Sequence, residues 1–367
     1  MQELCIIEFE FAKDYFEPIK KIVREGNPLI TTAYIEDIYF LENYMLSGKN
    51  AKFNVLLDNN IFTRLVYLAK GGQIQGDDES IKTYKFCCAV MCFFILGGFD
   101  IEPNLALYER ASKNTHSNAI KDIDHFRVAD HIHPMGYAEL ALGVRDKFSD
   151  KEINKARNII DKNLQKTEEQ NYSKQLNDWK IKYLHLLKII EIQKCKLEDT
   201  EQIKIFFEWI TKDCFTTPAT IMFALLFFSP NRHSLGKMIK NVNSQNNKLK
   251  DGLKNAAWDL TYLTSLRNKS KNQSEDTIWF LCTHDKLLQT IARSLYLKEG
   301  QEIETAVYNL INEFWGTKKG SQVYDYYKKM VVTVSENNIA RTERNREISK
   351  QVGKMIEDLE SRIFSAS

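Results

Sequence analysis

The chain has 367 residues, enough for two domains or for one domain with a large insertion. Its apolar content of 43% and charged content of 27% are typical of a globular protein, and no apolar run reaches the ~20 residues that a membrane-spanning helix needs. The 51 Lys and Arg residues nearly balance the 49 Asp and Glu residues, so a contact with nucleic acid requires a local basic patch.

The seven cysteines contain no C-x-x-C pair and no Cys/His series with the spacing of a zinc site. Most of them lie in apolar stretches, where a free cysteine behaves as a small hydrophobic residue. Cys87, Cys88 and Cys92 have helical spacing and are expected in a core. This usage predicts a reducing compartment, so we expect a cytoplasmic protein without a membrane contact.

The first part of the chain alternates helical patterns with short apolar runs. We expect helices over most of 1–50, a strand at 53–57, a helix at 61–70, a turn-rich loop at 71–78, a long apolar helix at 80–96, a short strand at 99–101 and a helix that begins at Pro103.

The next ~130 residues contain helical patterns and no convincing strand. The α/β pattern then resumes and gives way to a charged tail, whose apolar seam (348, 352, 355 and 359) docks on the body or supports a weak dimer. The expected elements are helices at 152–165, 171–195, 201–212 and 218–228, a helix through 256–260, a polar loop at 267–276, a strand at 277–282 and helices from Lys286, at 302–315 and at 321–332.

Two apolar runs each lead into an aspartate. Residues 53–57 are followed directly by Asp58, and residues 277–282 are followed by Thr283, His284 and Asp285. Runs of this length that lead into helical patterns indicate buried parallel strands, and ligands of open α/β sheets gather at the carboxyl ends of such strands. Carboxylates brought to one edge repel unless a cation or a proton separates them, so this pattern predicts a divalent-cation site.

Two further acids fit the same edge. Glu109 lies one turn into the helix that follows the strand at 99–101. Asp259 lies on an amphipathic helix whose exit loop leads into the last strand, and in a right-handed crossover the early turns of that helix approach the carboxyl edge. Four acids, Asp58, Glu109, Asp259 and Asp285, are therefore expected to converge.

This order of elements resembles the PIN-domain nucleases. That family has an apolar strand ending in Asp, a Glu early in a later helix, an Asp on a helix and an apolar strand followed by a T-x-D turn. The corresponding segments here are Val55-Leu56-Leu57-Asp58, Leu107-Tyr108-Glu109, Ala257-Trp258-Asp259 and Cys282-Thr283-His284-Asp285.

The resemblance covers about 53–112 and 246–297 and implies an α/β fold: a PIN-like three-layer core with a short central parallel sheet flanked by helices. The large insertion departs from the family pattern. The domains expected are a helical N-terminal extension (1–50), the core (51–112 and 246–300), an all-helical insertion (113–245) and a helical C-terminal extension (301–367).

The resemblance implies metal-dependent hydrolysis of phosphodiester bonds, of RNA more than of DNA, leaving a 5′-phosphate and a 3′-hydroxyl. Mg²⁺ or Mn²⁺ would activate a water and stabilise the charge of the transition state. A toxin or phage-defence effector, or an RNA-processing enzyme, is the biological role expected by analogy. The implied metal ligands are Asp58 and Asp285 directly, and Glu109 and Asp259 directly or through water, with Asn60 and Thr283 hydrogen-bonded around them and Glu109 a candidate base.

Each acid also has a purely structural interpretation. Asp58 and Asp285 precede helices and can be N-caps, Glu109 can be a solvated helix residue, and Asp259 can pair with Arg267 or a lysine. A non-catalytic PIN-like module that binds RNA or protein is therefore the alternative. Phosphatases of the haloacid dehalogenase type need an aspartate where Asn60 stands, and no phosphate-binding glycine loop is present.

Residues 232–254 are locally basic and lead into the helix that carries Asp259. They indicate contact with a nucleic-acid backbone, or simply a solvated surface. The candidate side chains are Arg232, Lys237, Lys240, Lys248, Lys250 and Lys254.

A second polar segment holds His125, His131 and His133 among Asp122, Asp124 and Asp130. Histidines two apart beside acids can bind zinc or copper, but their spacing fits no known structural site, so a phosphate or substrate contact or a polar surface is expected before a metal. The sequence leaves open a homo-oligomer or a regulatory protein partner.

Overall fold

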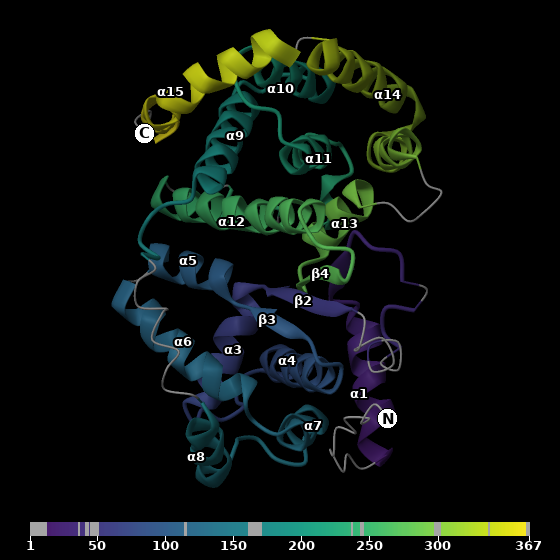
Figure 1. Ribbon diagram of the computed structural model, residues 1–367. Coiled ribbons are helices and arrows are strands. Elements are labelled where there is room, and N and C mark those ends of the chain that lie inside the picture. Colours follow the sequence, from purple (N-terminus) through teal and green to yellow (C-terminus); the bar gives the residue numbers. More distant parts are fainter. Residues whose placement is uncertain are drawn as a thin grey trace. The chain divides into compact units, whose positions relative to one another are not determined.

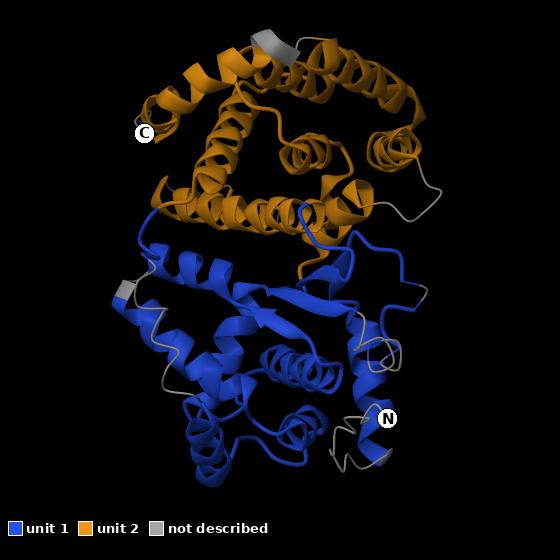
Figure 2. Ribbon diagram, viewed as in Figure 1, with its two compact units in different colours: residues 1–174, 272–284 blue, residues 175–271, 285–367 orange. Residues whose placement is uncertain are grey.

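The computed structural model describes residues 13–35, 37–40, 44, 51–113, 116–160, 171–235, 238–242, 246–296, 302–336 and 338–364 (Figure 1). The chain forms two units, coloured separately in Figure 2: unit 1 comprises residues 1–174 and 272–284, and unit 2 comprises residues 175–271 and 285–367. The limits of these units differ from the domain boundaries expected from the sequence, because the stretch 113–245 contributes to both.

Unit 1 contains a four-stranded mixed sheet in the order β1-β4-β2-β3. The strands are β1 (Leu29–Thr31), β2 (Lys52–Leu57), β3 (Asp100–Glu102) and β4 (Thr277–Cys282). The two predicted runs become β2 and β4, which are parallel neighbours with Leu57 opposite Cys282. β3 is parallel to the other side of β2, with Glu102 opposite Leu56.

The sheet is not purely parallel as predicted, because β1 pairs antiparallel with β4. β1 lies in the region that was expected to be helical. A strand of three residues is too short to show an alternating pattern, and pairing with the distant β4 is what makes it a strand. The α/β class is confirmed, whereas the parallel sheet is corrected to a mixed one.

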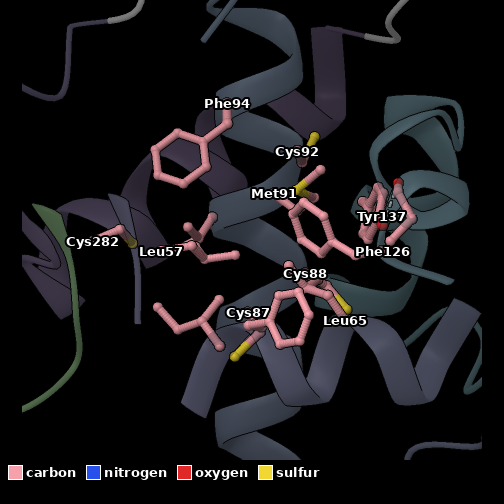
Figure 3. Packing of buried hydrophobic residues seen from close by; sticks show 14 of the residues in the cluster. Leu57, Leu65, Cys87, Cys88, Met91, Cys92, Phe94, Phe126, Tyr137 and Cys282 are labelled. Atoms are coloured by element: carbon pink, nitrogen blue, oxygen red, sulfur yellow. Dashed lines mark hydrogen bonds between the residues drawn. The ribbon is translucent and has the colours of Figure 1, made fainter. Parts of the chain in front are cut away.

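The core of unit 1 lies against one face of the sheet. Phe53, Val55 and Leu57 alternate along β2 and belong to one buried cluster with residues of α1 (Lys13–Gly26), α3 (Asn59–Ala69) and α4 (Asp78–Leu96). α4 is buried along most of its last three turns, as the long apolar run predicts. Figure 3 shows Leu57 and Cys282 of the sheet with Cys87, Cys88, Met91 and Cys92 of α4, so these cysteines are core residues.

Four helices follow β3: α5 (Asn104–Lys113), α6 (His116–Asp130), α7 (Pro134–Leu142) and α8 (Asp150–Ile159). α6 packs on α3 and α5, and α7 packs on α4. Neither α6 nor α7 was predicted from the sequence as a separate helix. α7 nonetheless has clear boundary signals, since Pro134 occupies its first turn and Gly143, at φ +75°, ends it in the left-handed conformation.

Unit 2 is helical in all its described elements: α9 (Asn177–Lys194), α10 (Asp199–Lys212), α11 (Pro218–Phe227), the 3₁₀ turn η2 (Arg232–Leu235), α12 (Asn246–Lys271), α13 (Lys286–Leu295), α14 (Ile303–Glu336) and α15 (Asn338–Phe364). α12 continues through half of the loop predicted at 267–276. Gly316, at φ +71°, interrupts α14 and separates two helical stretches, in agreement with the helices predicted at 302–315 and 321–332.

The C-terminal seam docks within unit 2. Ile348, Val352 and Leu359 are buried, and α15 packs against α9. Glu360 fixes this arrangement because it accepts hydrogen bonds from the Tyr183 hydroxyl at 2.6 Å and from a lysine of α12 at 2.8 Å. Of the two interpretations of the seam, docking on the body of the protein is the one seen here.

Candidate functional site

Asp58 lies at the carboxyl end of β2 and is 5% exposed. Its backbone is extended, at φ −61° and ψ 140°, so it ends the strand and caps α3. One carboxylate oxygen, Oδ1, accepts the Asn60 backbone N–H at 2.9 Å, and the other, Oδ2, accepts the Thr283 hydroxyl at 2.7 Å. The Asn60 side chain itself is exposed. Asp58 is thus both a cap and a buried carboxylate at the sheet edge.

Glu109 lies on α5 and is 7% exposed. Its Oε1 accepts the Asn59 side-chain amide at 3.1 Å and the Lys113 ammonium at 2.6 Å. Glu109 is thus hydrogen-bonded to the residue that directly follows Asp58 in the chain. Sequence reasoning missed both Asn59 and Lys113, although the spacing of four residues between Glu109 and Lys113 was a readable signal.

A third buried carboxylate belongs to Asp122 on α6, which is 3% exposed. It accepts hydrogen bonds from Lys70 Nζ at 2.8 Å and from Arg110 Nε at 2.8 Å. Arg110 adjoins Glu109 in α5, so this ion cluster stabilises the packing of α5 and α6 behind the candidate site. The sequence analysis had placed Asp122 only in the polar histidine segment.

The T-x-D turn has a different role for each of its residues. Thr283 is fully buried, donates its hydroxyl to Asp58, and its backbone N–H reaches the Pro28 carbonyl at 3.0 Å. His284 packs against Phe86 of α4, with the ring centroids 4.6 Å apart and the ring planes tilted by 39°. Asp285 begins unit 2 and caps α13, where its Oδ1 accepts the backbone N–H groups of Leu287 and Leu288 at 2.8 and 3.1 Å.

Asp259 is half-buried on α12, inside unit 2. The four predicted acids are therefore divided, Asp58 and Glu109 in unit 1 and Asp259 and Asp285 in unit 2, and their joint convergence stays a prediction. Across the described ranges, no group of three or more His, Cys, Asp or Glu side chains is arranged to hold a metal ion.

The thiols close to Asp58 are not nucleophiles. Burial raises the pKa of Cys87 to about 12, and the negative charge of Asp58 adds to this rise. Burial also raises the pKa of Cys282 well above its usual range. Both side chains therefore stay neutral thiols near pH 7, and the reactive chemistry available at this edge is that of carboxylates.

The predicted basic segment lies in unit 2, and two of its cations have partners within the protein. Arg232 donates to the Phe227 carbonyl at 3.1 Å and lies over the ring of that residue. Lys250 pairs with Glu360 at 2.8 Å. Lys240 and Lys248 are exposed, Lys254 is half-buried, and Lys237 lies outside the described residues.

The histidine segment does not form a cluster either. His131 Nδ1 lies 2.9 Å from the Arg127 carbonyl, and His133 caps α7 by accepting the Met135 backbone N–H. Burial lowers the pKa of His125 and of His133, so both imidazoles favour the neutral form. A neutral imidazole is a weaker partner for a phosphate than a charged one.

No protein-family model matches the chain, and no curated protein or solved structure is significantly similar to it. None of the helices in the described ranges is both long and apolar enough to cross a membrane. The function is therefore argued from the geometry of the sheet edge alone.

Proposed function

We propose that this chain is a divalent-metal-dependent nuclease with a PIN-like core in unit 1, acting on single-stranded or structured RNA in preference to DNA. The observation that carries the proposal is two buried carboxylates: Asp58 directly follows β2, and Glu109 lies on the helix after the neighbouring parallel strand β3 and accepts a hydrogen bond from Asn59, the residue next to Asp58. Carboxylates at the carboxyl edge of a parallel sheet are suited to binding a cation.

The donor set of the pair suits Mg²⁺ or Mn²⁺, since both metals prefer hard carboxylate oxygens. Asp58 and Glu109 would hold the ion, and Thr283 would orient Asp58. Lys113 neutralises Glu109 in this structure, but it is 42% exposed, so its flexible side chain has room to move into solvent. A bound cation would lower the pKa of a water and stabilise charge on the phosphate.

The decisive experiment is cleavage of end-labelled single-stranded RNA and DNA with Mn²⁺ or Mg²⁺. We expect EDTA to abolish cleavage, and Asp58→Asn and Glu109→Gln each to lower the rate by about 100-fold or more. Asp124→Asn is the matched control, because this acid of unit 1 is 64% exposed and pairs with Arg127, which is not a partner of Asp58 or Glu109. Cleavage that survives Asp58→Asn would overturn the proposal.

A second measurement tests the cation directly, without activity. Mn²⁺ should raise the melting temperature of the protein, and Asp58→Asn should remove that rise. Lys113→Met should make the rise in melting temperature caused by Mn²⁺ severalfold larger, because it removes the ammonium that competes with the cation for Glu109. The rise measured for Asp259→Asn and for Asp285→Asn shows whether either acid of unit 2 contributes to binding of the cation.

One observation favours the alternative, a non-catalytic module that binds RNA or protein. Both carboxylates of unit 1 are already satisfied by protein donors, Asp58 by a hydroxyl and a backbone N–H, and Glu109 by an amide and an ammonium. Such groups can be purely structural. RNA binding without cleavage, together with a melting temperature that Mn²⁺ leaves unchanged, would favour this function.

A further inference from the structure

Unit 2 contains a cavity of about 490 Å³ that is lined mainly by α11, α13 and α14. Its buried wall is apolar and includes Ile221, Met222, Val307 and Met330, each at most 6% exposed. Cavities of this size with an apolar lining and a few polar groups are typical of sites for small molecules. No part of the candidate nuclease site in unit 1 lines this cavity.

The lining is also positively charged. Arg267 is the one charged residue among the described residues that line the cavity. Thr216, another lining residue, accepts a hydrogen bond from the guanidinium of Arg341. A bound anion would therefore find a cation in the described lining.

Arg344 lies one turn after Arg341 on α15. Nε and Nη2 of Arg344 are buried and have no hydrogen-bond partner in the described structure. Burial lowers the pKa of Arg341, and the nearby positive charge of Arg344 lowers it further. Arg341 therefore brings a second guanidinium next to the lining through Thr216, and the unpartnered donors of Arg344 lie one turn further along α15.

We propose that the cavity binds a small amphipathic anion, with an aliphatic body against the apolar wall and a carboxylate or phosphate head group at Arg267. The apolar wall selects the body of the ligand by excluding water, and the arginine selects the sign of the head group. Binding of such a ligand would bridge α11, α12, α13 and α14, and so it would stabilise unit 2. This inference does not depend on the proposed nuclease activity.

Isothermal titration calorimetry of the full chain tests the proposal with three probes, decanoate, decyl phosphate and decan-1-ol, below their micelle concentrations. We expect saturable binding of one or both anions and at least about tenfold weaker binding of the neutral alcohol. Comparison of decanoate with decyl phosphate identifies the preferred head group. Equal binding of the alcohol and the anions, or no binding of any probe, would overturn the proposal.

Two matched pairs of variants locate the site. Arg267→Gln should weaken binding of the anion by about tenfold and leave the alcohol unchanged, whereas Lys271→Gln, one turn further along α12 and outside the lining, should change it by less than about twofold. Val331→Glu should abolish binding and Val332→Glu should not, because both valines are exposed, at 37% and 51%, but only Val331 lines the cavity.

These substitutions are at exposed positions, so the fold should survive them, and a far-UV circular dichroism spectrum checks this. Anion binding that is insensitive to both Arg267→Gln and Val331→Glu would place the ligand elsewhere and refute the assignment.

Discussion

Gly252 provides a test in which helix propensity and packing predict opposite results. It lies inside α12, where a glycine is normally unfavourable compared with alanine by about 1 kcal/mol. A Cβ atom at this position would lie 1.9 Å from the Lys240 carbonyl oxygen and 3.4 Å from the Ile239 side chain. The first contact is with backbone, which cannot rotate away as the end of a side chain can.

We expect Gly252→Ala to destabilise the protein. Overpacking of this kind typically costs about 1–3 kcal/mol, and the upper part of that range applies because the clash is with a main-chain atom. Subtracting the gain in propensity of about 1 kcal/mol leaves a net loss of about 1–2 kcal/mol in the free energy of unfolding. The segment around Lys240 would have to move away from α12 to accommodate the methyl group.

Gly353→Ala is the matched control within unit 2. Gly353 lies inside α15, and a Cβ atom there would meet nothing within 4 Å. This substitution should raise the free energy of unfolding by about 0.5–1 kcal/mol, because alanine favours the helix. Urea unfolding followed by far-UV circular dichroism compares the two variants with the unmodified protein. A Gly252→Ala variant that is as stable as Gly353→Ala would refute the close approach of the Lys240 carbonyl.

Three further variants test buried or half-buried polar groups by thermal or urea unfolding. Asp122→Ala should lower the free energy of unfolding by about 2–3 kcal/mol. This is less than the loss expected for a fully buried ion pair, because Lys70 and Arg110, the two partners of Asp122, both reach solvent. A loss under about 0.5 kcal/mol would contradict the ion cluster. Burial lowers the pKa of His185 to about 3, and its Nε2 lies 3.3 Å from the Cys214 sulfur. As the pH drops from about 6.5 to about 3, this histidine takes up a proton in the unfolded chain but not in the folded one, so the free energy of unfolding falls. His185→Phe should flatten that part of the dependence of stability on pH. Burial alone would raise the pKa of Glu152, but hydrogen bonds from Arg145 and Ser149 outweigh it and lower the pKa to about 2. The destabilisation by Glu152→Gln should therefore be largest above about pH 4.5 and disappear as the pH approaches 2. A destabilisation that does not depend on pH would contradict the ion pair between Glu152 and Arg145.

Local patterns in the sequence were sufficient to place the strands that define the candidate site. β2 and β4 are compact apolar runs with polar flanks, and their ends at Leu57 and Cys282 follow from that contrast. The same contrast places Asp58 at the end of a strand. β1 was missed because three residues carry no period. α6 was missed because its buried face includes the charged Asp122, and α7 because it is buried on most sides and so lacks a polar face.

The contacts of the candidate residues could not be predicted from local patterns, because they join distant parts of the chain. The Asn59 amide reaches Glu109 fifty positions later, and Thr283 reaches Asp58 across 225 positions. Lys250, a candidate contact for a nucleic acid or a residue of a solvated surface in the sequence, pairs with Glu360, which comes from the C-terminal helix. Charge along the sequence identifies which side chains are available for binding, whereas tertiary packing decides which of them are engaged within the protein.

The path of the chain through the sheet has a consequence for biosynthesis. β4 lies between β1 and β2, yet it belongs to a short return of the chain, residues 272–284, flanked on both sides by segments of unit 2. β2 ends at Leu57 and β4 at Cys282, so the ribosome adds 225 residues after β2 before β4 is complete. At about 5–20 residues per second this takes roughly 10–45 s.

During that interval β1 lacks its only strand partner among the described elements, and one edge of β2 stays open. An open strand edge is a template for pairing with other chains. The nascent protein therefore depends on its own late segment to close the sheet, and any truncation before residue 277 would leave that edge permanently exposed to aggregation.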